Sequence, residues 1–150
     1  METAEELASQ RGLRVLRSEA AGEVQMGEWT GLSFEQLDAQ QEWRRFNTVR
    51  SMTRIPGGEL MLETQARIVT ELESLRCRHP EQVVAVVSHG DVIKGAVAHF
   101  AGTPLDLFQR IEISPASVSV VRLADYGPNI QRVNDTGAFD ADSLWSRRPL

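Results

Sequence analysis

The pattern of apolar and polar residues predicts three long helices and a shorter one. Apolar residues recur at helical spacing in residues 2–10, 59–76 and 92–100. The predicted buried face of the second helix consists of Leu62, Ala66, Val69 and Leu72. Ser33 followed by Gln36 forms a capping-box pattern, so a further helix is expected from about Phe34.

Other segments carry the patterns of strands. Residues 13–16 form a short strand candidate, and the valine-rich residues 117–123 and 129–133 are expected to form an antiparallel hairpin. Residues 82–87 are a continuous β-branched run, which is typical of a strand buried on both faces of a parallel sheet. The predicted fold class is therefore α/β, with a mainly parallel sheet flanked by helices. Residues 1–150 are expected to form a single domain, with a loosely ordered tail at 138–150.

The valine run leads directly into Ser88-His89-Gly90-Asp91, where a helical pattern begins. Ligands of open α/β sheets bind at the carboxyl ends of strands, and helix N-termini attract anions. We therefore expect His89 to face a phosphoryl group, although a strand, turn and helix of this kind is often purely structural.

Composition excludes several classes of function. A net charge of -5 without a basic stripe argues against a nucleic acid or a membrane surface as partner. No run is long enough to span a bilayer, so a cytoplasmic protein is expected. Cys77 has no second cysteine to pair with and is predicted to be a small apolar filler. Metal-binding, serine-hydrolase and triphosphate-binding motifs are absent from the sequence, so no metal or other cofactor is expected.

A loop with three glycines, residues 22–31, offers two carboxylates, Glu23 and Glu28. A carboxylic acid beside a bound phosphate could act as a general acid on the leaving oxygen, while a histidine donates hydrogen bonds to phosphoryl oxygens. Spacing alone does not choose between the two glutamates.

Several segments together resemble the histidine phosphatase superfamily, the phosphoglycerate-mutase-like proteins. Glu23 followed by Gly27-Glu28-Trp29-Thr30-Gly31 resembles the family's Glu…Gly-x-Trp-x-Gly segment, and Val87-Ser88-His89-Gly90 resembles its second histidine motif. Further similar segments are Pro56-Gly57-Gly58-Glu59, Asp91-Val92-Ile93-Lys94, Phe108-Gln109-Arg110-Ile111, Pro115-Ala116-Ser117-Val118 and Asn134-Asp135-Thr136. They cover nearly the whole chain in the order of the family.

The resemblance implies phosphoryl transfer from a small phosphorylated metabolite to a histidine, then to water or a second hydroxyl, without a metal. It makes Glu23 the proton donor to the leaving group and His89 the second histidine, which stabilises the phosphoryl group. Ser88, Gly90 and Asp91 are the residues it implies for substrate binding, with backbone N–H groups of the helix start.

One departure from the family changes the expected activity. The family's nucleophile lies in an Arg-His-Gly motif after its first, central strand, and the sequence contains no Arg-His-Gly. Glu2-Thr3-Ala4 resembles a helix that follows this region in the family, so the chain is expected to be N-terminally short and to lack the first central strand. Such a loss exposes ladder groups and apolar surface, at a cost comparable to the ~5–15 kcal/mol that stabilises a domain.

Three hypotheses follow. The first is a histidine-phosphatase-type phosphomonoesterase that is inactive in this form because the nucleophilic histidine and the phosphate-binding arginines are missing. The second is a non-catalytic relative that binds a phosphorylated ligand or a partner, with a second copy or a strand-donating partner completing the sheet. The third is an unrelated α/β binding protein.

Overall fold

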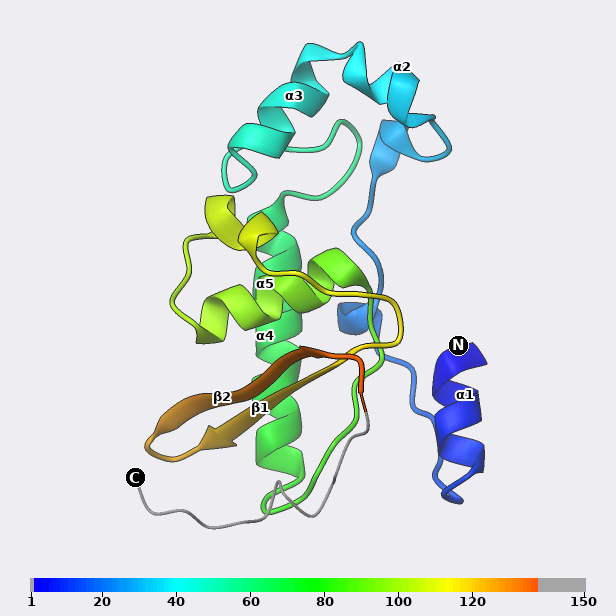
Figure 1. The fold of residues 1–150 in the computed structure, drawn as a ribbon, viewed down its shortest axis with the longest axis vertical. Coiled ribbons are helices and arrows are strands. Elements are labelled where there is room, and N and C mark those ends of the chain that lie inside the picture. Colours follow the sequence, from blue (N-terminus) through cyan, green and yellow to red (C-terminus); the bar gives the residue numbers. More distant parts are fainter. Residues whose placement is uncertain (1, 138–150) are drawn as a thin grey trace.

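The computed structural model describes residues 2–137, and it shows a helix-rich chain with one small sheet (Figure 1). The predicted tail, residues 138–150, lies outside the described residues, and the single-domain organisation stays a prediction. The helices are α1 (Glu2–Ser9), α2 (Phe34–Asp38), α3 (Gln41–Thr48), α4 (Met61–Arg78) and α5 (Gly90–Phe100). Three short 3₁₀ helices and two strands complete the described chain: η1 (Glu19–Ala21), η2 (Gly27–Trp29), η3 (Leu105–Arg110), β1 (Val118–Ala124) and β2 (Gly127–Asp135).

Helix α4 forms the axis of the molecule, and α5 and the hairpin lie across it (Figure 1). Helices α2 and α3 lie at one end of the molecule, whereas α1 lies at the edge. The capping box predicted at Ser33 is present: its hydroxyl accepts the backbone N–H of Gln36, and the Gln36 side chain accepts the backbone N–H of Ser33. Local signals in the sequence therefore correctly place the start of α2.

The hairpin is confirmed. β1 and β2 pair in antiparallel fashion, with Val121 opposite Ile130 and Ala124 opposite Gly127, and two register irregularities lie near Val120. Within residues 2–137 this is the only sheet, and the parallel pairing predicted for residues 82–87 is not present there. The predicted strand at residues 13–16 likewise has no ladder partner in that range. The physical reason is the same for both: extended segments become sheet only where another strand satisfies their backbone groups.

The main core lies between α4, α5, η3 and the loops that connect α3 to α4. Its largest fully buried side chains are Phe46, Phe108, Ile55, Met61, Val92 and Thr64. The buried stripe of α4 differs from the predicted one, because Met61, Thr64 and Ile68 face the core while Leu62 is 45% exposed. The buried face of α4 is thus displaced by about one residue from the predicted face, which corresponds to a rotation of about 100° around the helix axis. Cys77 is exposed, so its prediction as a core filler is wrong.

Two glycine loops pass each other with their backbones in direct contact. Glu28 N–H donates to Pro56 O at 2.8 Å, and Glu59 N–H donates to Gln25 O at 3.0 Å. A Cβ added to Gly58 would lie 2.2 Å from Gln25 O. The Gly-rich loop after η1 is therefore fixed against the segment that precedes α4, and only glycine fits at the crossing.

We expect Gly58→Ala to destabilise the chain by about 3 kcal/mol, because the added methyl group meets backbone and forces the two loops apart. The matched control is Gly95→Ala in the interior of α5, where the nearest atoms to an added Cβ are 3.9 Å away. Alanine is favoured over glycine within a helix, so this control should unfold at the same or higher urea concentration. Equal loss of stability in the two variants would contradict the crossing geometry.

Candidate functional site

The structure brings Glu23 and His89 together. His89 Nδ1 lies 3.2 Å from Glu23 Oε2, although 66 residues separate the two in the sequence. Both side chains are about half exposed, at 51% and 54%, so the pair faces solvent rather than the core. The other candidate of the loop, Glu28, has no such contact with His89 among the described residues. Of the two carboxylates that spacing left open, Glu23 is the one that contacts His89, and its role as proton donor stays a prediction.

A second contact fixes the segment before His89 to the loop before Glu23. Ser88 Oγ donates a hydrogen bond to the backbone carbonyl of Ala21 at 2.8 Å. Since Ala21 ends η1 and Glu23 follows two residues later, this bond sets the approach of the two segments that carry the pair. The serine hydroxyl therefore has a positioning role in this structure, and its predicted contact with substrate stays a prediction.

Arg67 of α4 binds the backbone of the loop that carries Glu23. The Arg67 guanidinium donates to the backbone carbonyls of Ala20 at 2.5 Å and of Glu23 at 3.1 Å. It also forms two bonds to the carboxylate of Glu59, at 2.8 and 3.1 Å. One planar cation thereby satisfies several oxygens of a tight loop, a task that suits the fixed fork of arginine donors.

Glu59 completes this arrangement from the segment before α4. Burial raises the pKa of the Glu59 carboxyl, but hydrogen bonds from the Arg67 guanidinium, the Gln25 backbone N–H and the Thr64 hydroxyl together outweigh it and lower the pKa. The Glu59 side chain is 12% exposed and that of Arg67 is 22% exposed, so water screens this ion pair only in part. Glu59 is therefore an ionised anchor for the loop.

Behind His89, the first turn of α5 is anchored by a buried arginine. Arg50 lies 3.0 Å from the carboxylate of Asp91, and its guanidinium is 4.4 Å from the ring centroid of Phe46 and 4.9 Å from that of Phe108. Burial lowers the pKa of Arg50, and the Asp91 charge opposes this shift. Since its carboxylate is engaged by Arg50, Asp91 orients the helix start here, and its predicted contact with substrate stays a prediction.

The start of α5 is open in front of this anchored turn. His89 is the N-cap with extended backbone (φ -109°, ψ 158°), and its side chain makes no capping hydrogen bond. Apart from its chain neighbours and the backbone of its own helix, no described atom lies within 4 Å of a Cβ built on Gly90. The first N–H groups of a helix have no partners inside it, and they carry partial positive charge. The space beside His89 and Gly90 can therefore receive an anion.

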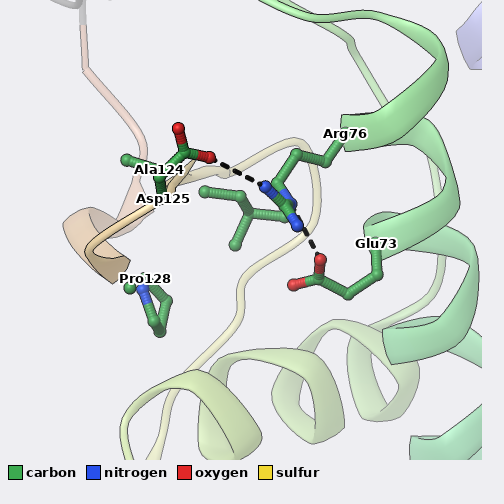
Figure 2. Close-up of a pocket in the computed structure, with 7 residues that line it drawn as sticks. Glu73, Arg76, Ala124, Asp125 and Pro128 are labelled. Carbon is green, nitrogen blue, oxygen red and sulfur yellow. Dashed lines mark hydrogen bonds and ion pairs between the residues drawn. The ribbon is translucent and has the colours of Figure 1, made fainter.

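Two hollows of the described chain lie elsewhere. One, of about 300 Å³, lies between α4 and the turn of the hairpin, where Arg76 contacts Glu73 and Asp125 (Figure 2). The other, of about 420 Å³, is lined by residues of α5, η3 and β2. Neither includes Glu23 or His89. Among residues 2–137, no group of three or more His, Cys, Asp or Glu side chains is arranged to hold a metal ion.

Sequence reasoning missed the residues that hold the site in place. Arg50 and Arg67 were not singled out, because a buried arginine looks like any surface arginine in a helical or loop pattern. From the sequence, Glu59 was named only as the last residue of Pro-Gly-Gly-Glu. In the structure this motif crosses the Glu23 loop, and Glu59 binds Gln25 there. The available signal was Glu59 at the end of a glycine turn, followed about two helical turns later by Arg67.

The lowered pKa of Glu59 predicts a specific dependence of stability on pH. A carboxyl whose pKa is lower in the folded state contributes stability above its ordinary pKa, about 4.3, and loses it as pH falls through the lowered value. Glu59→Gln should therefore cost about 2 kcal/mol at pH 7 and flatten the loss of stability below about pH 4.3. Urea unfolding between pH 7 and pH 3 measures both effects.

The matched control is Glu42→Gln, an exposed acidic position in the first turn of α3. It should change neither the stability at pH 7 nor the slope. Glu63, whose pKa is lowered to about 2 chiefly by its hydrogen bond from Arg54, keeps contributing to the acid limb in both variants. An unchanged slope in Glu59→Gln would contradict the ionised anchor.

Comparison with known proteins agrees with the fold. Residues 1–136 match the model of the histidine phosphatase superfamily (branch 1). Phosphoserine phosphatase 1 of Hydrogenobacter thermophilus is 28% identical over 136 residues, which are 89% of this chain and 64% of the relative. The chain thus spans a little under two thirds of the length of this curated relative.

Solved structures show the same fold. YhfR of Bacillus stearothermophilus superposes with a TM-score of 0.85 at 24% identity, over 91% of this chain and 69% of its own. The mycobacterial glucosyl-3-phosphoglycerate phosphatase in complex with VO3 gives 0.77 at 25% identity, over 90% and 70%. The α/β fold class predicted from the sequence is confirmed by these likenesses, although parallel pairing is not present among residues 2–137. With a family match that runs through all of the described elements, the chain belongs to the histidine phosphatase superfamily.

Proposed function

We propose that this chain carries the proton-donor half of a phosphomonoesterase site and binds the phosphoryl group of a small phosphorylated metabolite. The observation that carries the proposal is the contact of Glu23 with His89 at the open N-terminus of α5. The names of the relatives, a phosphoserine phosphatase and a glucosyl-3-phosphoglycerate phosphatase, support a phosphomonoester as the class of ligand.

Each residue of the pair has a distinct task in this proposal. The His89 imidazole donates a hydrogen bond to a phosphoryl oxygen, and the backbone N–H groups of the first turn of α5 donate hydrogen bonds to the other phosphoryl oxygens. In a site completed by a nucleophile, the protonated form of Glu23 would give its proton to the oxygen of the leaving alcohol as the P–O bond breaks and the phosphoryl group passes to that nucleophile. Its position 3.2 Å from His89 supports this role.

The nucleophile is the part of the site that these 150 residues do not supply. The sequence contains no Arg-His-Gly, and of its three histidines His79 and His99 lie at the end of α4 and near the end of α5. His89 lies within ion-pair distance of Glu23, and its motif resembles the second histidine motif of the family, so we assign it to stabilising the phosphoryl group rather than attacking it. The 150-residue chain is accordingly expected to bind phosphate without turnover. A non-catalytic relative that binds a phosphorylated ligand would behave in the same way.

The class of ligand and the location of the protein in the cell are also proposals. No helix among residues 2–137 is long and apolar enough to cross a membrane. A phosphorylated metabolite, rather than a nucleic acid or a lipid surface, is the ligand class that an acidic chain with one local anion site favours. Location in the cytoplasm stays a prediction from the sequence.

Titration with inorganic phosphate tests the binding half of the proposal. Histidine Cε1–H resonances should shift at His89, and His89→Ala should weaken binding about tenfold, the effect of one hydrogen bond to a charged group. Glu23→Gln should tighten binding, because the change removes a carboxylate charge beside the phosphate. His79→Ala, at the far end of α4, is the matched control and should leave affinity unchanged. Binding that ignores His89→Ala would overturn the assignment of the site.

Hydrolysis of p-nitrophenyl phosphate tests the assignment of His89. The 150-residue chain should release no nitrophenol above buffer, and no acid-labile phosphohistidine should form on incubation with the ester. Turnover that disappears in both His89→Ala and Glu23→Gln would show that the site works without Arg-His-Gly, and would contradict the proposed division of roles. Phosphate binding without turnover is the expected result.

A further inference from the structure

Asp91 places a carboxylate in the part of α5 that is proposed to bind a phosphoryl group. It stands in the first turn of the helix, just after His89 and Gly90, and its side chain is 34% exposed. An acidic residue there normally stabilises a helix, because the N-terminus carries partial positive charge. For a bound phosphate dianion the same carboxylate is a like charge, and it competes for the same positive end of the helix. A phosphate site at this position therefore requires that the charge of Asp91 be neutralised.

Arg50 supplies a neutralising charge in a fixed place. Its Nη1 donates to Asp91 Oδ2 at 3.0 Å, and its Nη2 donates to Asn47 Oδ1 at 2.6 Å. The guanidinium also lies 4.4 Å from the ring centroid of Phe46 and 4.9 Å from that of Phe108. These partners belong to α3, η3 and α5, so the cation cannot turn away from Asp91 without losing contacts to several elements.

Burial makes this cation act more strongly on its surroundings than a surface arginine would. The side chain of Arg50 is only 7% exposed, and this burial lowers its pKa, while the charge of Asp91 opposes the shift. Water and salt screen a buried charge much less than an exposed one. The positive charge of Arg50 therefore acts on Asp91 and on the helix start with little screening.

Stability alone gives a weak reason for an arginine at this position. Arg50 Nε is buried and has no hydrogen-bond partner among the described residues. A buried donor without a partner is costly, and buried ion pairs often add little net stability because the loss of hydration offsets the attraction. The arrangement is better explained by the charge that it places beside the first turn of α5.

We propose that Arg50 is a positioning residue of the phosphoryl site, which holds the Asp91 carboxylate and cancels its charge so that the first turn of α5 can receive a phosphate dianion. This inference rests on the proposed function, because it concerns the same site. It differs from a purely structural anchor between α3 and α5, which would depend on the contact of Arg50 with Asp91 but not on their charges.

Substitutions that separate charge from contact test the proposal in a titration with inorganic phosphate. Asp91→Asn removes the charge but keeps an amide oxygen for the Arg50 N–H, and it should tighten binding about threefold or more, because the cation is then uncompensated. Arg50→Met leaves the carboxylate without its cation and should weaken binding about tenfold. The double variant carries neither charge, and its affinity should return to within about threefold of that of the unsubstituted chain.

A structural anchor gives a different pattern. Arg50→Met and the double variant lose the same contact, so both should then weaken binding alike, and Asp91→Asn should not tighten it. Either result overturns the proposal. The control is Arg122→Met, which removes an exposed cation of β1 and should leave the affinity unchanged. Urea unfolding checks that each variant is folded in the titration. If Arg50→Met is unfolded, the direction of the change in Asp91→Asn decides alone.

The same titration distinguishes failure of this inference from failure of the proposed function. Phosphate binding that is absent from the unsubstituted chain, or that ignores His89→Ala, overturns the proposed function and the inference with it. Binding that depends on His89 but responds to neither Arg50→Met nor Asp91→Asn overturns the inference alone.

Discussion

The guanidinium of Arg67 is the contact on which the candidate site depends. It extends from α4 and donates hydrogen bonds to the carbonyls of Ala20 and Glu23, and it also forms an ion pair with the Glu59 carboxylate. A loop this tight turns several carbonyls inward, and buried carbonyls without a donor are costly. One arginine on a rigid helix satisfies them together, and this fixes the backbone from which the Glu23 side chain extends.

The crossing of the glycine loops acts together with this cation. Glu59 N–H donates to Gln25 O while the Glu59 carboxylate accepts the Gln25 N–H, so one residue binds both backbone groups of its neighbour across the crossing. Helix α4 begins two residues later, and the loop is thus attached to the longest element of the fold. On the other side of the pair, Arg50 holds the first turn of α5 through Asp91. Glu23 and His89 are therefore positioned by two separate buried or half-buried arginines.

Short-range signals in the sequence predicted much of this structure. The capping box at Ser33, the hairpin near residues 117–133 and the helix after His89 all follow from patterns within a dozen residues. Reasoning from the residues expected a carboxylate of the glycine loop near His89 but left Glu23 and Glu28 open, and only the resemblance to the family chose Glu23.

The failures of the sequence analysis have physical causes too. Residues 82–87 have the composition of a buried strand, but a strand also needs a partner for its backbone groups, and composition cannot state whether one is present. The exposed face of α4 was misassigned because apolar residues lie on two adjacent stripes of that helix, and only the packing of α5 against it decides between them. Arg50 and Arg67 were missed because burial of an arginine is a property of the assembled fold.

The valine-rich residues 82–87, which have no strand partner among residues 2–137, have a consequence for how the two halves of the site move. The Glu23 half is held by ion pairs and backbone bonds to α4, and its local unfolding requires breaking several of them at once. The segment entering His89 is held chiefly by the single bond from Ser88 to Ala21. Local opening free energies differ widely within one protein, and segments with few buried contacts open first. The distance between Glu23 and His89 is therefore expected to vary mainly through local opening of the segment before His89, while the backbone of Glu23 stays fixed.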